Sequence, residues 1–153
     1  ISEADADIGA WVKKTPIAKL LTTAPGVGTV TALYFVAAID DISRFPDAHT
    51  LQSYLGLTPG EHSSGLKVRR TGITKAGSRA VRWTLIQACW TIRRTRPNHP
   101  IALWAKRIEL RRGRMIATVA MARKLAGIMY AMWRDNKPYN PLLGADTQPE
   151  QAG

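Results

Sequence analysis

The segment RMIATVAMARKLAGIMYAMWR, residues 114–134, decides the fold class because its apolar residues cover most faces of a helix. A surface helix carries one apolar stripe, whereas a helix that is apolar nearly all round is covered by neighbours on several sides. We therefore expect residues 114–134 to form a central helix around which the other helices pack. Gly113 directly precedes the segment and marks where this helix begins.

Helical spacing of apolar residues extends through the rest of the chain. A buried stripe at i, i+4, i+7 and i+11 is expected on the helix of residues 78–94, formed by Val81, Leu85, Ala88 and Ile92. Shorter helices, one of them capped by Asp47, are expected in the segments 16–24, 29–39, 48–55 and 101–112. Residues 56–76 are rich in Gly, Ser and Pro and are expected to form a loop. The sequence thus predicts an all-α fold, a compact helical domain.

We expect three parts along the chain. Residues 1–15 form the end of a longer helix, residues 16–134 form the helical domain, and residues 135–153 form a loose tail rich in Pro and Gly. No membrane span is expected, since no apolar run reaches about 18 residues. The single cysteine, Cys89, cannot form an internal disulfide, which permits the cytoplasmic location that we expect.

The positive charge of the chain is concentrated in one block. The net charge is +11, but residues 66–134 carry 17 Lys or Arg and one acid, whereas residues 1–65 carry four cations and seven acids. A block this one-sided repels itself unless a polyanion lies against it. Nucleic acid is therefore the expected partner, and a solubilising surface is the alternative.

Two glycines punctuate LLTTAPGVGTVTALYFVAAI, residues 20–39, in the pattern of a helix-hairpin-helix. Gly26 and Gly28 permit a tight turn and a close approach of the backbone to a ligand. We expect Val27 to pack inward and the amides around Val27 to Thr29 to lie at a helix N-terminus. Orphan N–H groups and the helix dipole favour a DNA phosphate there. A plain turn between two helices is the alternative.

Cations cluster around a second Gly-containing stretch, RRTGITKAGSRAVR, residues 69–82. Gly77 or Ser78 is expected to cap a helix there, and Arg79 and Arg82 share a helix face because they are three residues apart. Arginine binds phosphate through two parallel hydrogen bonds. The DNA-contacting residues predicted in this part of the chain are Lys67, Arg69, Arg70, Thr74, Lys75, Gly77, Arg79 and Arg82. A merely solvated charged face is the alternative.

Two adjacent serines precede this basic stretch in GEHSSGLKVRR, residues 60–70. A serine attacks phosphorus only where its proton is removed and the developing charge is stabilised. Nearby arginines are candidates for the second requirement, and His62 is a candidate for the first. Loop serines more often serve turn chemistry alone. The residues by themselves therefore leave both interpretations open for Ser63 and Ser64.

The remaining reactive groups are interpreted as structural. No metal-binding cluster is visible in the sequence, and the adjacent acids Asp40 and Asp41 are expected at a helix end and turn. Cys89 is expected to be a small buried hydrophobe. The tryptophans expected to lie mostly in the core are Trp83, Trp90, Trp104 and Trp133.

The chain resembles the C-terminal, serine-bearing transposase domain of the Piv/MooV type, the insertion-sequence one-ten family of RNA-guided DNA recombinases. The resemblance runs from about Ile17 to Tyr130 and is carried by LLTTAPGVGTVTALYFVAAIDDISRF, LQSYLGLTPGEHSSG, GITKAGSRAVRWTLIQA and MIATVAMARKLAGIMYAMWR. The Pro-Gly-x-Gly turn is common among DNA-binding proteins, whereas the ordered series YLGL, SSG and GITKAG is specific.

The resemblance implies site-specific DNA recombination. Ser64 maps onto the family's serine nucleophile, which forms a covalent phosphoserine link to DNA. Ser63 is the alternative because, with two adjacent serines, either one can be aligned with the family's serine. Residues 1–15 resemble the end of a connector helix. A non-catalytic helix-hairpin-helix nucleic-acid-binding module, or an RNA-binding structural protein, are the alternatives to this function.

The resemblance also implies partners outside this chain. These are a guide RNA, further copies in a homo-oligomer whose composite site forms between protomers, and an N-terminal RuvC-like domain holding Mg2+ on four carboxylates. No residues of this chain match that domain. The chain alone is therefore expected to hold no cofactor and to lack strand-cleavage activity.

Overall fold

The computed structural model describes residues 16–58 and 65–141, with side chains from residue 79 onward in the second stretch. The described residues form helices and no strand. In chain order the elements are α2 (Pro16–Leu21), α3 (Thr29–Ile39), the 3-10 helix η1 (Ile42–Arg44), α4 (Ala48–Tyr54), α5 (Gly65–Thr95), α6 (Pro100–Arg112) and α7 (Arg114–Asp135). The all-α prediction is confirmed.

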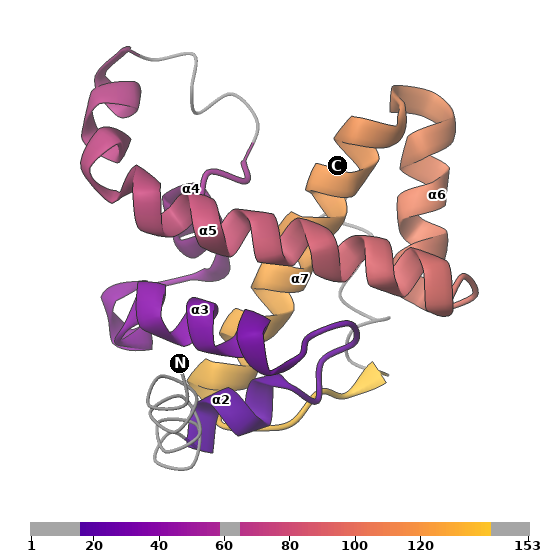
Figure 1. Ribbon diagram of the computed structural model, residues 1–153, viewed down its shortest axis with the longest axis horizontal. Helices are drawn as coiled ribbons and strands as arrows, with labels where there is room; N and C mark the ends of the chain where they lie inside the picture. The colour runs from indigo at the N-terminus through magenta and orange to yellow at the C-terminus, as the bar shows by residue number, and fades with distance from the viewer. Residues whose placement is uncertain (1–15, 59–64, 142–153) are drawn as a thin grey trace, which may run out of the picture.

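Helix α7 is the centre of the fold, as its apolar composition predicts. It packs against α2, α4, α5, α6 and η1, and its buried positions run from Ala117 to Met132. Figure 1 shows α5 crossing in front of α7, with α2 and α3 on one side of α5 and α6 on the other. Gly127 faces α4, where the Gln52 side chain donates from Nε2 to the Arg123 carbonyl at 2.8 Å.

Helix α7 is also long and apolar enough to cross a membrane by length and composition alone. Its apolar sequence is interrupted by Arg123 and Lys124, so the expectation that no uninterrupted apolar run reaches about 18 residues still holds. The apolar window of the helix is, however, 56% buried inside the fold. A core helix of a globular domain has this character because its apolar faces are covered by neighbouring helices.

Helix α5 begins well before the position that the sequence predicts. Its expected stripe is confirmed as buried and consists of Val81, Leu85, Ala88 and Ile92. The helix nevertheless starts at Gly65, so the expected loop of residues 56–76 is wrong from residue 65 onward. Neither Gly77 nor Ser78 caps it. An interior glycine costs only about 1 kcal/mol relative to alanine, and an existing helix gains one hydrogen bond for each residue added.

Both ends of α4 are fixed by local hydrogen bonds. The Asp47 carboxylate accepts the Thr50 backbone N–H at 2.8 Å, which confirms the predicted cap. At the other end Gly56 has φ +74°, and the Leu57 N–H donates to the Gln52 carbonyl at 2.9 Å. This is a Schellman turn, which glycine permits because the left-handed backbone region strains other residues.

The start of the expected tail packs against the fold. The Tyr139 backbone N–H donates to the Thr23 hydroxyl at 2.9 Å, and its ring lies 6.2 Å from that of His99. The chain therefore returns to the α2–α3 turn after α7 ends. Residues 142–153, and the expected connector helix of residues 1–15, lie outside the described residues.

Candidate nucleic-acid interface

The α2–α3 turn needs one of its two glycines for the fold. Gly26 has φ +74°, and a Cβ atom there would lie 2.7 Å from both the Ala88 carbonyl oxygen and the Ile92 side chain. Val27 is 5% exposed and packs inward, as predicted. The turn is therefore pressed against α5, and Gly26 makes that contact possible.

Gly28 is not required for the turn, which corrects the expectation that both glycines supply a permissive backbone. Its backbone is extended, with φ −98° and ψ −173°, and an added Cβ atom would meet nothing within 4 Å. Gly28 is the N-cap of α3 and offers no side-chain hydrogen bond. The first amides of α3, beginning at Thr29, have no acceptor within the helix. The absence of a side chain at Gly28 leaves these amides accessible to an external anion.

The two predicted phosphate-binding stretches lie at different places along α5. Gly26 lies against Ala88, and the predicted contacts from Lys67 to Arg82 precede Ala88 by 21 to 6 residues, or roughly 32 to 9 Å along the helix at 1.5 Å per residue. The two stretches therefore do not surround a single phosphate.

Arg79 and Arg82 have different surroundings although they share one side of α5. Arg79 is exposed. Arg82 is half-buried, and its Nη1 donates to the Leu55 carbonyl at 3.1 Å. A Cβ atom on Gly56 would lie 2.7 Å from this Nη1, so the guanidinium is seated against the turn that ends α4. Arg82 therefore links α5 to the end of α4 through a hydrogen bond. The sequence predicted Arg82 only as a DNA contact and not this bond within the fold.

The chain is anchored just before the segment that carries the serines. Thr58 is buried, and its hydroxyl lies 3.1 Å from that of Ser53. Arg123 of α7 donates from Nη1 to the Leu57 carbonyl at 3.3 Å, and burial lowers the pKa of its guanidinium. Sequence reasoning missed this anchor, because nothing local to Arg123 points to α4.

The predicted nucleophiles themselves lie outside the described residues. Ser63, Ser64 and His62 belong to the segment 59–64, between buried Thr58 and the first residue of α5. For five further predicted contacts the structure describes the backbone alone. These are Lys67, Arg69, Arg70, Thr74 and Lys75, all in the first half of α5. Gly77 lies on the same helix, away from its N-terminus.

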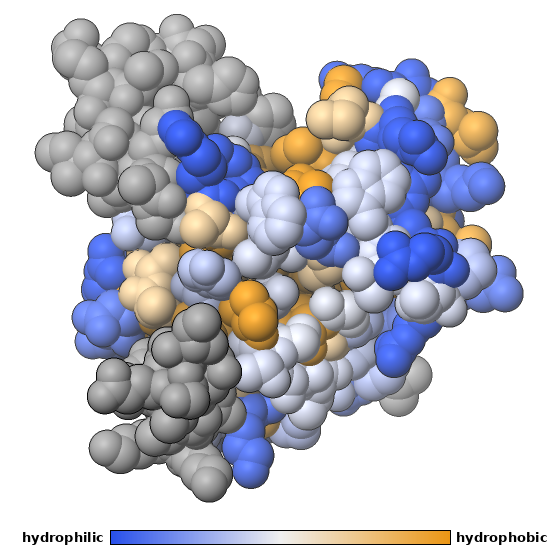
Figure 2. Space-filling model, in the orientation of Figure 1, coloured by the Kyte–Doolittle hydropathy of each residue, from blue (hydrophilic) through white to orange (hydrophobic). Residues whose placement is uncertain are grey.

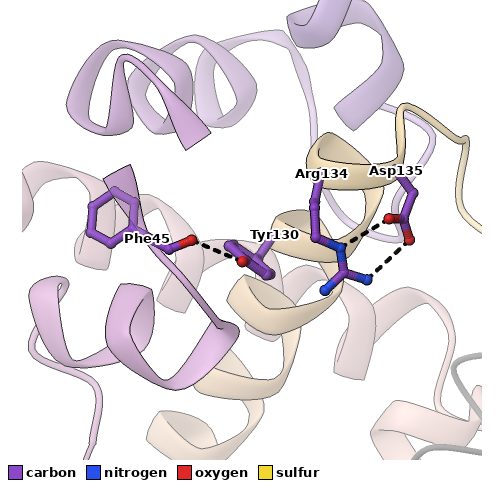
Figure 3. A network of polar contacts seen from close by, with 4 residues as sticks. All are labelled: Phe45, Tyr130, Arg134 and Asp135. Carbon is purple, nitrogen blue, oxygen red and sulfur yellow. Dashed lines mark hydrogen bonds and ion pairs between the residues drawn. The ribbon is translucent and has the colours of Figure 1, made fainter. Parts of the chain in front are cut away.

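The last turn of α7 uses its polar groups within the fold (Figure 3). The Tyr130 hydroxyl donates to the Phe45 carbonyl at 2.9 Å. Arg134 donates from Nε and Nη2 to the Asp135 carboxylate at 2.9 and 3.0 Å, and this bonding lowers the pKa of Asp135. Arg134 therefore has its charge matched locally and adds little to the positive field.

Other groups singled out in the sequence mostly have structural surroundings. The Asp41 carboxylate accepts the Ser43 N–H at 3.0 Å, which lowers its pKa. Cys89 is buried as predicted, and this burial raises the pKa of its thiol to about 12. Trp104 is 7% exposed, but the core assignment is wrong for Trp83, which is 63% exposed. Trp83 falls opposite the buried stripe of α5, because two residues beyond Val81 the helix has turned about 200°.

Comparison with known proteins places the chain in a family. Residues 18–103 match the model of the transposase IS116/IS110/IS902 family. The chain belongs to this transposase family. The match runs from α2 into α6, so it includes the α2–α3 turn and all of α5. The predicted family is confirmed, while the serine-bearing role and RNA guidance stay predictions.

Curated relatives carry matching names. The transposase for insertion sequence element IS1111A of Coxiella burnetii (strain RSA 493 / Nine Mile phase I) is 33% identical over 141 residues, covering 91% of this chain and 39% of that protein. The pilin gene-inverting protein of Moraxella bovis is 32% identical over 150 residues, covering 94% and 46%. The chain thus spans less than half the length of these relatives. No solved structure matches it.

Proposed function

We propose that this chain is the DNA-binding, serine-nucleophile domain of a site-specific recombinase that moves an insertion sequence. The observation that carries the proposal is the family match over residues 18–103, a span that contains both glycine-containing stretches and the two serines between them. The one-sided positive charge of residues 66–134 supports a polyanionic substrate.

In the proposed reaction, the hydroxyl oxygen of Ser64 forms a bond to a DNA phosphorus. The bond between that phosphorus and one strand oxygen breaks, the serine proton passes to a base, and the leaving strand oxygen takes up a proton. The product is a phosphoserine link, and attack by the hydroxyl of another strand end reverses the step and joins the new strands. Ser63 is the alternative nucleophile. Splitting one displacement into two in this way is the general advantage of covalent catalysis.

The metal that we expect belongs to a RuvC-like domain outside this chain. Within residues 16–58 and 65–141 no group of three or more His, Cys, Asp or Glu side chains gathers to hold an ion. The described part of the chain therefore does not fit a resident Mg2+. Its proposed work is to bind and orient DNA, and the chain alone is expected to leave DNA uncut.

The proposed DNA contacts use phosphates rather than bases. The cations in the first half of α5, from Lys67 to Lys75, lie roughly 32 to 20 Å along that helix from Ala88, where the α2–α3 turn meets it. Contacts of this kind fix the register of a duplex but carry no sequence information. We therefore propose that a guide RNA chooses the target, that the composite site forms in a homo-oligomer, and that the enzyme works in the cytoplasm.

The decisive experiment uses the full-length transposase with its DNA and RNA. We expect Ser64→Ala to abolish a covalent protein–DNA adduct and Ser63→Ala to retain it, and DNA binding to persist in both variants. An adduct retained in Ser64→Ala and lost in Ser63→Ala moves the nucleophile by one residue. An adduct retained in both variants and in the double variant contradicts the serine chemistry and leaves a non-catalytic binding module.

A further inference from the structure

Four exposed apolar side chains lie at the corner between α6 and α7. Gly113, with φ +94°, is the one residue between the two helices. Leu110 is 78% exposed and Met115 is 71% exposed, one on each side of that glycine. Leu103 and Ile116 are 43% and 46% exposed. We call residues 103–116 the α6–α7 corner. Figure 1 shows its helices standing at one edge of the molecule.

The α6–α7 corner is also strongly basic. Its exposed cations are Lys106, Arg107, Arg111, Arg112 and Arg114. Its one acid, Glu109, forms an ion pair with Arg93 of α5, and this hydrogen bond lowers the pKa of the carboxyl group. The acid is therefore hydrogen-bonded to a cation outside the corner, and although Arg114 and Lys106 also act on it, five cations against one acid leave the corner strongly positive. In Figure 2 this edge of the molecule is blue with orange patches, which are the hydrophilic and apolar side chains together.

The α6–α7 corner is held in a fixed position by packing on its inner side. The Arg114 guanidinium lies 5.2 Å from the centre of the Trp90 ring of α5, and Arg93 lies 5.6 Å from the same ring. Trp104 is 7% exposed, and Lys124 of α7 lies 4.8 Å from its ring centre. The outward side chains therefore project from a framework that is already organised, which lowers the entropy cost of binding.

The charge of the α6–α7 corner decides which partner it fits. Five cations against one paired acid repel a second copy of the same surface and attract a polyanion. Four of the five are arginines, whose planar guanidinium groups match phosphate oxygens through paired hydrogen bonds. Proteins that bend duplex DNA place exposed apolar side chains among such cations and press them against base steps in the minor groove. Because the chain belongs to a transposase family, duplex DNA is the polyanion that we expect this corner to bind.

We propose that the α6–α7 corner is a second contact surface for duplex DNA. Arg107, Arg111 and Arg112 bind phosphates, and Leu110 and Met115 press against the sugars and bases of the minor groove. Trp90, which anchors the corner, is about 25 residues beyond Gly65, so roughly 37 Å of helix separates the corner from the serine end of α5. This placement rests on the proposed function: with Ser64 at the reacting phosphate, the corner grips DNA that flanks that phosphate by about one helical turn.

The test measures binding of the 153-residue chain to a labelled DNA duplex by fluorescence anisotropy across salt concentrations. Arg107→Gln with Arg111→Gln removes two corner cations, and Lys19→Gln with Lys137→Gln removes two exposed cations elsewhere as the matched control. We expect the corner pair to weaken binding at least tenfold and to lower the slope of log affinity against log salt by about 1.8, since each phosphate contact contributes about 0.9. The control pair is expected to keep the wild-type slope.

A second pair of variants tests the apolar contact separately. Leu110→Ser with Met115→Ser is expected to weaken binding several-fold without changing the salt slope, because no phosphate contact is lost. The proposal is overturned if both corner pairs of variants keep the wild-type DNA affinity and salt slope. It is also overturned if these variants lose binding to phosphatidylserine vesicles while their DNA binding stays intact. Covalent adduct formation at saturating DNA is a separate readout, since it depends on Ser64 and not on the corner.

Discussion

Replacing Gly26 with alanine tests how the α2–α3 turn is seated on α5. The added Cβ atom would lie 2.7 Å from the Ala88 carbonyl oxygen and 2.7 Å from the Ile92 side chain. Alanine at φ +74° costs about 1–2 kcal/mol, and relieving the clash with a packed helix costs about 1–3 kcal/mol more. We therefore expect Gly26→Ala to lower the free energy of unfolding by about 2–5 kcal/mol, a large share of the roughly 5–15 kcal/mol of a typical domain.

Urea denaturation followed by circular dichroism measures this change, and Gly28→Val is the matched control. Gly28 has an extended backbone and open space around it, so the larger side chain is expected to cost about 1 kcal/mol or less. The same Gly28→Val variant is expected to weaken DNA binding, because its side chain stands in front of the first amides of α3. A Gly26→Ala variant within about 0.5 kcal/mol of wild type would refute the close contact with α5.

Three further predictions concern buried or half-buried groups. Burial, and then Arg96, lower the pKa of His99, whose Nδ1 accepts the Ile101 N–H at 3.1 Å. The folded state thus binds the proton less readily than the unfolded state. The contribution of His99 to stability is therefore fully present above its ordinary pKa of about 6.5 and falls as the pH drops below that value. We expect His99→Asn, which keeps a cap, to show a smaller fall in melting temperature between pH 7.5 and pH 5.5, and an unchanged fall contradicts this assignment. Arg123→Met leaves the Leu57 carbonyl without its donor and is expected to lower the free energy of unfolding in urea by about 1–3 kcal/mol; an unchanged urea midpoint argues against the anchor. The Cys89 thiol, buried with a pKa of about 12, is expected to resist a disulfide reagent at pH 8 until urea unfolds the chain, and rapid labelling of the native protein would show that the thiol is accessible.

The helices could largely be predicted from the sequence because their signals are local. Apolar periodicity located the stripe from Val81 to Ile92 and the central position of residues 114–134. Asp47 and Gly113 mark helix starts through cap and glycine chemistry that acts within a few residues. Such signals depend only on which side chains lie within one or two helical turns of each other.

The remaining features depend on contacts between residues that are distant in the sequence. The two glycines of the α2–α3 turn look alike in the sequence, and only the approach of Ala88 to Gly26 distinguishes them. Arg82 is one cation among many until its contact with the Leu55 carbonyl is known. The early start of α5 does not follow from the local glycine signals, because an established helix extends through interior glycines at small cost.

The candidate site could be predicted only in outline. The basic block, the inward packing of Val27 and the helix N-terminus at Gly28 followed from composition and turn chemistry. The distance between the two glycine-containing stretches could not be predicted, because it depends on where Gly26 meets α5. The α6–α7 corner was missed altogether, since exposure of Leu110 and Met115 depends on how the two helices meet.

Direct mapping of the protein–DNA link tests the serine chemistry most sharply. The full-length transposase would be trapped on a DNA substrate whose second step is blocked, digested with protease and nuclease, and sequenced by tandem mass spectrometry. We expect a nucleotide mass on the peptide that contains residues 60–67, with fragment ions placing the phosphate on Ser64. A nucleotide on any residue outside Ser63 and Ser64, or cleaved DNA with no linked peptide, contradicts the proposed role of this domain.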